Sequence, residues 1–85
     1  MIYPVCAIRD AKTGFYPCQV EQSIPAAIRN FSMMINNGEG LVGFAPGDFD
    51  YYQVANFISH SEHQGRWRAA RSDTRPLLLL SQNQN

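Results

Sequence analysis

The sequence predicts a small α+β domain in which one amphipathic helix packs on one face of an antiparallel sheet of three or four strands. Three patterns lead to this prediction: an apolar run that reverses at a charged turn, a helical stripe of apolar residues, and a later run rich in aromatic and β-branched residues. The expected order is β-β-α-β, with a further strand left open. At 85 residues the chain is one domain. We place its core domain at residues 1–58, followed by a polar turn, a basic segment and a leucine-rich tail over 59–85.

The first predicted element is a hairpin. An apolar run from Ile2 enters residues 10–14, whose Asp, Lys, Thr and Gly side chains favour a chain reversal, and the chain returns through 15–18. A three-residue turn would place Cys6 and Cys18 opposite each other, whereas a four-residue turn would stagger them. We expect both cysteines to be reduced, because nothing in the chain indicates an oxidising compartment.

A helix is predicted over residues 24–36. Ser23 can cap its first turn, where Pro25 loses no helical hydrogen bond. Apolar residues recur at helical spacing and form one stripe, and Asn and Gly residues after it favour the helix end. The stripe consists of Ile24, Ile28, Phe31 and Ile35, widened by Ala27 and Met34.

Glycine-rich residues 38–47 are expected to cross to the sheet without regular structure, with Leu41, Val42 and Phe44 as apolar plugs. Their spacing matches neither a Walker motif nor a dinucleotide fingerprint. Residues 48–58 are predicted to form the next strand. Both faces of that strand carry apolar groups, which indicates a bulge.

The formal net charge of zero hides an asymmetry. Residues 1–63 carry three cationic and six acidic side chains, whereas residues 64–85 carry four arginines and one aspartate. The second part therefore resembles an electrostatic contact segment, with a solvated tail as the alternative. Residues 66–71 fit a short strand or a loose helix. Four consecutive leucines, 77–80, are expected to dock on a neighbouring protein or on the body of the domain.

Several classes of function find little support in the sequence. No apolar run approaches the ~20 residues that a membrane helix requires, and the first residues lack a signal-peptide pattern, so we expect an intracellular protein without membrane contact. We expect no metal, because His60 and His63 have no nearby cysteine or tight acidic cluster. Residues 59–63 are read as a turn rather than a catalytic cluster, so neither an enzyme nor a cofactor is expected.

A series of residues stands in a fixed order along the first two thirds of the chain. Its members are Ile8, Asp10, Lys12, Gly14, Tyr16, Pro17, Ala27, Arg29, Phe31, Asn36, Leu41, Pro46, Asp48, Phe49, Val54 and Phe57. This series resembles a known family, the nonstructural protein of gokushovirus-type microviruses, and the resemblance covers residues 5–58. Two positions depart from the family pattern, with Phe49 where Tyr is usual and Ala55 where Gly is usual.

This resemblance implies a protein of lytic phages with small single-stranded DNA genomes, acting in replication or packaging in the cytoplasm of the bacterial host. Single-stranded DNA binders combine cations for phosphates with rings on which bases stack. The sheet face opposite the helix is the expected contact surface, although each ring also has a core explanation. The candidate DNA-binding residues are Arg9, Lys12, Tyr16, Tyr51, Tyr52, Arg66, Trp67, Arg68 and Arg71.

The alternative function is a protein-interaction or assembly factor. In that reading the chain forms a homo-oligomer, or binds a phage or host protein, through its C-terminal tail. The contact residues would be Leu77, Leu78, Leu79 and Leu80. A homo-oligomer is also expected for the DNA-binding reading, since one helix covers only one face of the sheet.

Overall fold

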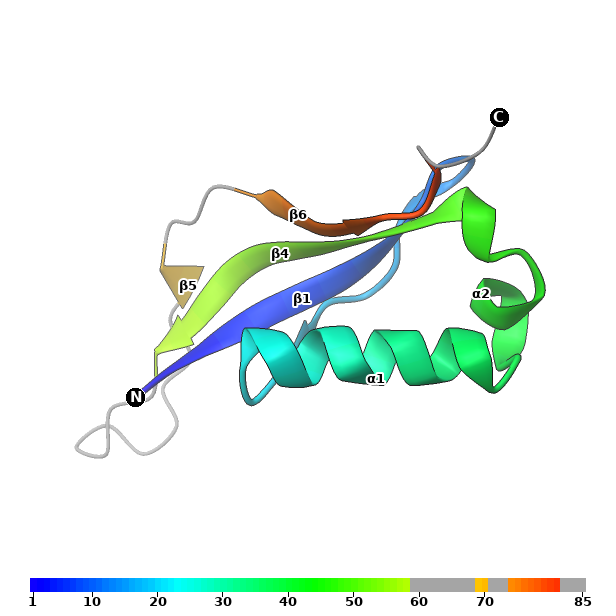
Figure 1. Ribbon diagram of the computed structural model, residues 1–85. Helices are drawn as coiled ribbons and strands as arrows, with labels where there is room; N and C mark the ends of the chain where they lie inside the picture. Colours follow the sequence, from blue (N-terminus) through cyan, green and yellow to red (C-terminus); the bar gives the residue numbers. More distant parts are fainter. Residues whose placement is uncertain (59–68, 71–73, 82–85) are drawn as a thin grey trace.

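The computed structural model describes residues 1–58, 69–70 and 74–81 (Figure 1). It confirms an α+β fold in which an antiparallel sheet carries a helix on one face. In chain order the elements are β1 (Ile2–Asp10), β2 (Gly14–Phe15), β3 (Gln19–Val20), α1 (Ile24–Asn36), α2 (Gly40–Phe44), the 3₁₀ helix η1 (Pro46–Asp48), β4 (Phe49–Ile58), β5 (Ala69–Ala70) and β6 (Arg75–Leu79).

The two long strands, β1 and β4, form the centre of the sheet. They are antiparallel and pair along their full lengths, from Ile2 opposite Ile58 to Asp10 opposite Phe49. The other edge of each long strand pairs with shorter strands. Strands β2 and β3 pair with the outer edge of β1, and β5 and β6 pair with the outer edge of β4. The described strands therefore fill four positions across the sheet.

A three-residue turn closes the hairpin between β1 and β2, with Asp10 opposite Gly14. The Asp10 carboxylate accepts a hydrogen bond from the backbone N–H of Lys12 at 2.8 Å, which stabilises the reversal. Gly14 has φ of 106°, a conformation that side chains disfavour. The charged turn predicted from the sequence is therefore explained residue by residue.

The register changes between β2 and β3. The pairing of Arg9 with Phe15, continued along the strand, would have put Cys6 opposite Cys18. One extra residue before β3 instead places Cys6 opposite Gln19. Both cysteines are free, as expected; Cys6 is buried and Cys18 is exposed.

Helix α1 has the predicted bounds. The Ser23 hydroxyl accepts a hydrogen bond from the backbone N–H of Ala26 at 3.2 Å, as an N-cap does. At the other end Gly38 has φ of 66°, and its N–H donates to the carbonyl of Ile35 at 3.1 Å. Both ends are thus fixed by local contacts that the sequence already indicates.

The expectation of no regular structure over 38–47 was wrong, because α2 and η1 form there. A Cβ placed on Gly43 would lie 2.2 Å from the backbone carbon of Gly38, so only glycine allows the chain to fold back this tightly. Of the three proposed plugs, Val42 is buried. Leu41 is exposed, and Phe44 is 84% exposed on the surface of α2.

Two register shifts interrupt the strand pairing in the sheet. In β4 the first falls at Val54, because Val5 pairs with Ala55 whereas Cys6 pairs with Gln53. This confirms the bulge indicated by the apolar groups on both faces of the strand. A second register shift, at Leu77 of β6, accompanies the pairing of that strand with β4.

The core lies between the sheet and α1. The ring of Phe31, 1% exposed, stacks on the ring of Tyr51 with centroids 4.6 Å apart and planes 2° from parallel. Cys6, Ala27 and Phe49 are buried around this pair. The stripe predicted on the helix therefore meets the sheet through one aromatic stack.

Strand β6 is fixed at both ends by side-chain hydrogen bonds. Arg75 Nε donates to Gln53 Oε1 at 2.8 Å. Beyond the strand, the backbone N–H and the hydroxyl of Ser81 both donate to the Asp50 carboxylate, at 2.9 Å and 2.7–2.8 Å. Asp50 is 2% exposed, so Ser81 supplies hydrogen bonds that a buried carboxylate requires. Of the two alternatives for the leucine tail, docking on the body is the one observed.

Among the helices that the structure describes, none is long and apolar enough to cross a membrane.

The position of Phe31 predicts a large effect on stability. Phe31→Ala removes a ring that is 1% exposed, and we expect the free energy of unfolding to fall by about 3–5 kcal/mol. Phe44→Ala is the matched control, because the same ring is removed from an exposed site, where we expect a change within about 0.5 kcal/mol. Urea unfolding followed by circular dichroism measures both. Equal losses in the two variants would contradict this assignment of the core.

Candidate nucleic-acid interface

The sheet face opposite α1, called the far face here, carries an aromatic pair. Alternation along the strands places Ala7 and Arg9 of β1 on this face, because their neighbours Cys6 and Ile8 contact the core. Phe15 lies opposite Arg9, and Tyr52 lies opposite Ala7. The rings of Phe15 and Tyr52 meet edge to face, with centroids 5.6 Å apart and planes at 73°.

Two cationic side chains flank this pair. Arg9 is half-buried beside Phe15. Lys12, at the tip of the hairpin, is 74% exposed, and its Nζ lies 3.5 Å from Asp48 Oδ2. An exposed ion pair of this kind contributes little to stability, so Lys12 can exchange its carboxylate partner for a phosphate at small cost. The far face therefore offers rings and cations within one hairpin and the strand beside it.

The other two tyrosines predicted to bind DNA lie elsewhere. Tyr51 is 5% exposed and stacked on Phe31, so neither side of its ring is available to a base. Tyr16 is half-buried, and its ring meets that of Phe49 edge to face at 5.8 Å. Tyr51 and Tyr52 differ because adjacent strand residues point to opposite faces of a sheet. For Tyr51 the core explanation holds.

The remaining predicted contacts divide into two groups. Arg66, Trp67, Arg68 and Arg71 lie outside the described residues. Three of the tail leucines, Leu77, Leu78 and Leu80, pack against the core, and Leu79 lies opposite Asp50 in β6. All four leucines are half-buried.

Phe15 is the residue that sequence reasoning missed. It is 53% exposed and provides most of the accessible aromatic surface in the far-face pair. The signal for it was present, because a three-residue turn places the first residue after Gly14 directly across from Arg9. Choosing the turn length from the sequence would have placed this ring beside that cation.

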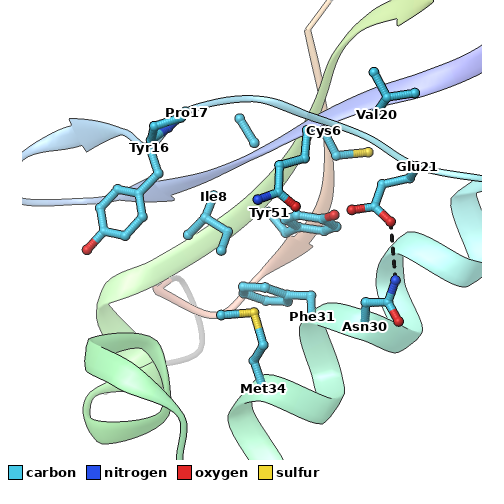
Figure 2. Close-up of a pocket in the computed structure, with 12 residues that line it drawn as sticks. Cys6, Ile8, Tyr16, Pro17, Val20, Glu21, Asn30, Phe31, Met34 and Tyr51 are labelled. Atoms are coloured by element: carbon cyan, nitrogen blue, oxygen red, sulfur yellow. Dashed lines mark hydrogen bonds between the residues drawn. The ribbon is translucent and has the colours of Figure 1, made fainter.

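A pocket of about 450 Å³ opens on the other side of the same sheet edge, between α1 and β3 (Figure 2). Glu21 lies at its rim, and one of its carboxylate oxygens accepts a hydrogen bond from Asn30 Nδ2 at 3.2 Å. The buried Tyr51 hydroxyl interacts with Glu21 and with the Cys6 thiol. Burial, followed by these two neighbours, raises the pKa of Tyr51 well above its ordinary value.

The Cys6 thiol in this pocket also has a perturbed acidity. Burial raises the pKa of Cys6 above its ordinary value of 9.0, and the hydrogen bond with Tyr51 partly opposes that effect. In the part of the chain that the structure describes, no group of three or more His, Cys, Asp or Glu side chains is arranged to hold a metal ion.

Comparison with known protein families gives a match over most of the chain. A family model described as Phage ORF5 protein matches residues 3–64. No curated protein and no solved structure matches the chain.

The two cysteines should differ sharply in reactivity. Only the thiolate attacks a disulfide reagent, and Cys6 is buried with a raised pKa, whereas Cys18 is exposed. At pH 8 we expect the native chain to release one equivalent of the coloured thiolate quickly from a chromogenic disulfide reagent. The unfolded chain should release two equivalents. Cys18→Ser should abolish the fast phase, and Cys6→Ser should retain it. Two fast equivalents from the native chain would contradict the burial of Cys6.

Proposed function

The chain belongs to the Phage ORF5 protein family, and on that premise we propose that it binds single-stranded DNA during replication or packaging of a phage genome. In this proposal it is a nonstructural protein of gokushovirus-type microviruses that acts in the cytoplasm of the bacterial host, as a binding protein rather than an enzyme. The observation that supports the proposal is the Phe15–Tyr52 pair on the far face, flanked by Arg9 and Lys12.

These side chains match the two requirements of single-strand recognition. Exposed rings stack on bases without regard to sequence, and arginine or lysine follows the phosphates. Phe15 supplies an accessible ring, Tyr52 holds it from one side, and Arg9 lies directly across the strand pair. A strand of DNA lying along the hairpin would therefore meet base-stacking and phosphate-binding groups together.

The basic segment enters the proposal on sequence grounds alone, because Arg66, Trp67, Arg68 and Arg71 lie outside the described residues. The described strand β5 pairs with Asn56 and Phe57 near the end of β4. Lys12 lies at the opposite end of the sheet, beside the start of β4. DNA that contacts both ends would span the length of β1, nine residues or about 30 Å.

Binding to oligo-dT tests the proposal. A plot of log K against log salt concentration should fall with a slope of about −0.7 for each phosphate that the protein neutralises. Arg9→Gln removes one such contact, so we expect the slope to become shallower by about 0.7. Phe15→Ala should weaken binding by about 1–3 kcal/mol through lost stacking. Fluorescence anisotropy at several salt concentrations measures both effects.

Phe44→Ala is the matched control for Phe15→Ala. It also removes a phenylalanine ring, and that ring is more exposed than Phe15, but it lies on α2 and away from the far face. Its affinity for oligo-dT should equal that of the unchanged chain. Binding that is insensitive to salt, or equal losses in the two variants, would contradict a far-face interface.

A second candidate function is assembly with a second copy or with a phage or host protein. Exposed apolar side chains on the α1–α2 side favour it, namely Met33, Leu41 and Phe44. The leucines of β6 pack on their own sheet, so in this proposal the contact lies on α2 rather than on the tail.

Solution mass tests the assembly role. If α2 forms a homo-oligomer contact, light scattering should give a multiple of 9.6 kDa, and Phe44→Ser should reduce it toward the single-chain mass. Ser32→Ala, a change in α1 that removes no exposed ring, serves as the control. A single-chain mass at every concentration would contradict a homo-oligomer.

A further inference from the structure

We propose that the pocket between α1 and β3 binds a guanine base through the Glu21 carboxylate. The proposal rests on the proposed function only for the source of the base, which in that case is single-stranded DNA. Many of the residues that line the pocket are apolar or aromatic, and Glu21 and Asn30 lie together at one side of it (Figure 2). The apolar residues include Ile8, Val20, Phe31 and Met34.

The size of the pocket fits a nucleoside. Its volume of about 450 Å³ lies in the range of small-molecule sites, about 300–1,000 Å³. Such a site holds a base with its sugar. The rings of Phe31 and Tyr51 are already stacked on each other, so the base would lie against their edges and against Ile8 and Met34 rather than between them.

The charge of the pocket selects for donors rather than for anions. Glu21 is a charged group at the rim of the pocket. Among the described residues that line the pocket there is no lysine, arginine or histidine. A phosphate would therefore be repelled and left in solvent. A carboxylate accepts hydrogen bonds and donates none, which favours a ligand edge that carries N–H groups.

Among the four DNA bases, guanine presents the matching edge. Its N1–H and N2–H groups are adjacent donors, and a carboxylate accepts both in a bidentate pair. Adenine and cytosine place a ring-nitrogen acceptor beside their amino group, which would oppose the carboxylate, and thymine places one N–H between two carbonyls. Glu21 has capacity for this pair, since a carboxylate offers about four acceptor positions, and Asn30 and Tyr51 occupy two of them.

Neighbouring polar groups hold the carboxylate in place. Asn30 Nδ2 donates to Glu21 from α1, and the Tyr51 hydroxyl approaches it from β4. Glu21 also anchors its own backbone, because its N–H donates to the carbonyl of Pro4 at 2.9 Å. A recognition group fixed from three elements loses little freedom when a ligand binds.

The pocket is connected to the far face by the edge of the sheet. Phe15 of β2 is followed at once by Tyr16 and Pro17, which line the pocket wall. A DNA strand that stacks on Phe15 reaches the pocket by passing over this edge. One base would then enter the pocket while its phosphates stay near the cationic groups of the hairpin.

Titration of the full chain with 2′-deoxyguanosine tests the pocket apart from DNA. We expect amide chemical-shift changes around Glu21, Asn30 and Phe31, and about tenfold weaker binding for 2′-deoxyinosine, which lacks the N2 amino group. Glu21→Gln should weaken deoxyguanosine binding by about tenfold or more. Glu39→Gln is the matched control, because Glu39 also accepts a hydrogen bond from an asparagine, Asn37, but lies outside the pocket.

Oligonucleotides then identify the source of the base. If DNA supplies it, oligo-dT carrying one dG binds more tightly than plain oligo-dT, and Glu21→Gln removes that preference while leaving the affinity for oligo-dT unchanged. Deoxyguanosine binding without a dG preference supports the pocket as a site for the free nucleoside. If the unchanged chain binds deoxyguanosine but does not bind oligo-dT, the proposed function is overturned and the pocket proposal is not. Equal binding of deoxyguanosine and deoxyadenosine, or binding of neither, overturns the pocket proposal.

Discussion

The full-length pairing of β1 with β4 is the constraint on which the rest of the structure depends. It leaves one edge for the hairpin return and one edge for β6, and it determines which side chains face α1. Because residues alternate between faces, this one register sends Tyr51 into the core and Tyr52 to the far face. The bulge at Val54 then keeps the second half of β4 paired with the start of β1. A one-residue slip would exchange the core and the proposed contact surface.

The parts of the fold that could be predicted from sequence are those determined by local chemistry. Ser23 and the glycine after the apolar stripe locate α1, and the charged turn locates the hairpin. The course of 38–47 could not be predicted, because it depends on the close approach of Gly43 to Gly38, which is a contact between two backbones. Which tyrosine is buried likewise depends on the strand partner rather than on the residue type.

The candidate site was predictable only in part, for the same reason. Arg9, Lys12 and Tyr52 lie together on or beside the far face, as the candidate list from the sequence implied. Phe15 joins them only because the turn has three residues, which places it across from Arg9. Glu21 drew no attention in the sequence, since a lone carboxylate outside a motif indicates nothing. Its position becomes distinctive through Asn30 and Tyr51, which come from α1 and β4. Cations and rings thus lie on one side of a sheet edge, and a carboxylate lies on the other.

The hydrogen bonds from Ser81 to Asp50 have a consequence for the synthesis of the chain. Asp50 lies in the middle of the sequence, but the groups that satisfy its buried carboxylate leave the ribosome 31 residues later. Until then, the outer edge of β4 lacks β6 and its backbone groups are open to pairing with other strands. Helix α1 and the hairpin can assemble early, whereas the sheet is completed only by the last strand. A ribosome that stops before residue 81 therefore releases a sheet whose β4 edge is open and whose buried Asp50 lacks the hydrogen bonds from Ser81.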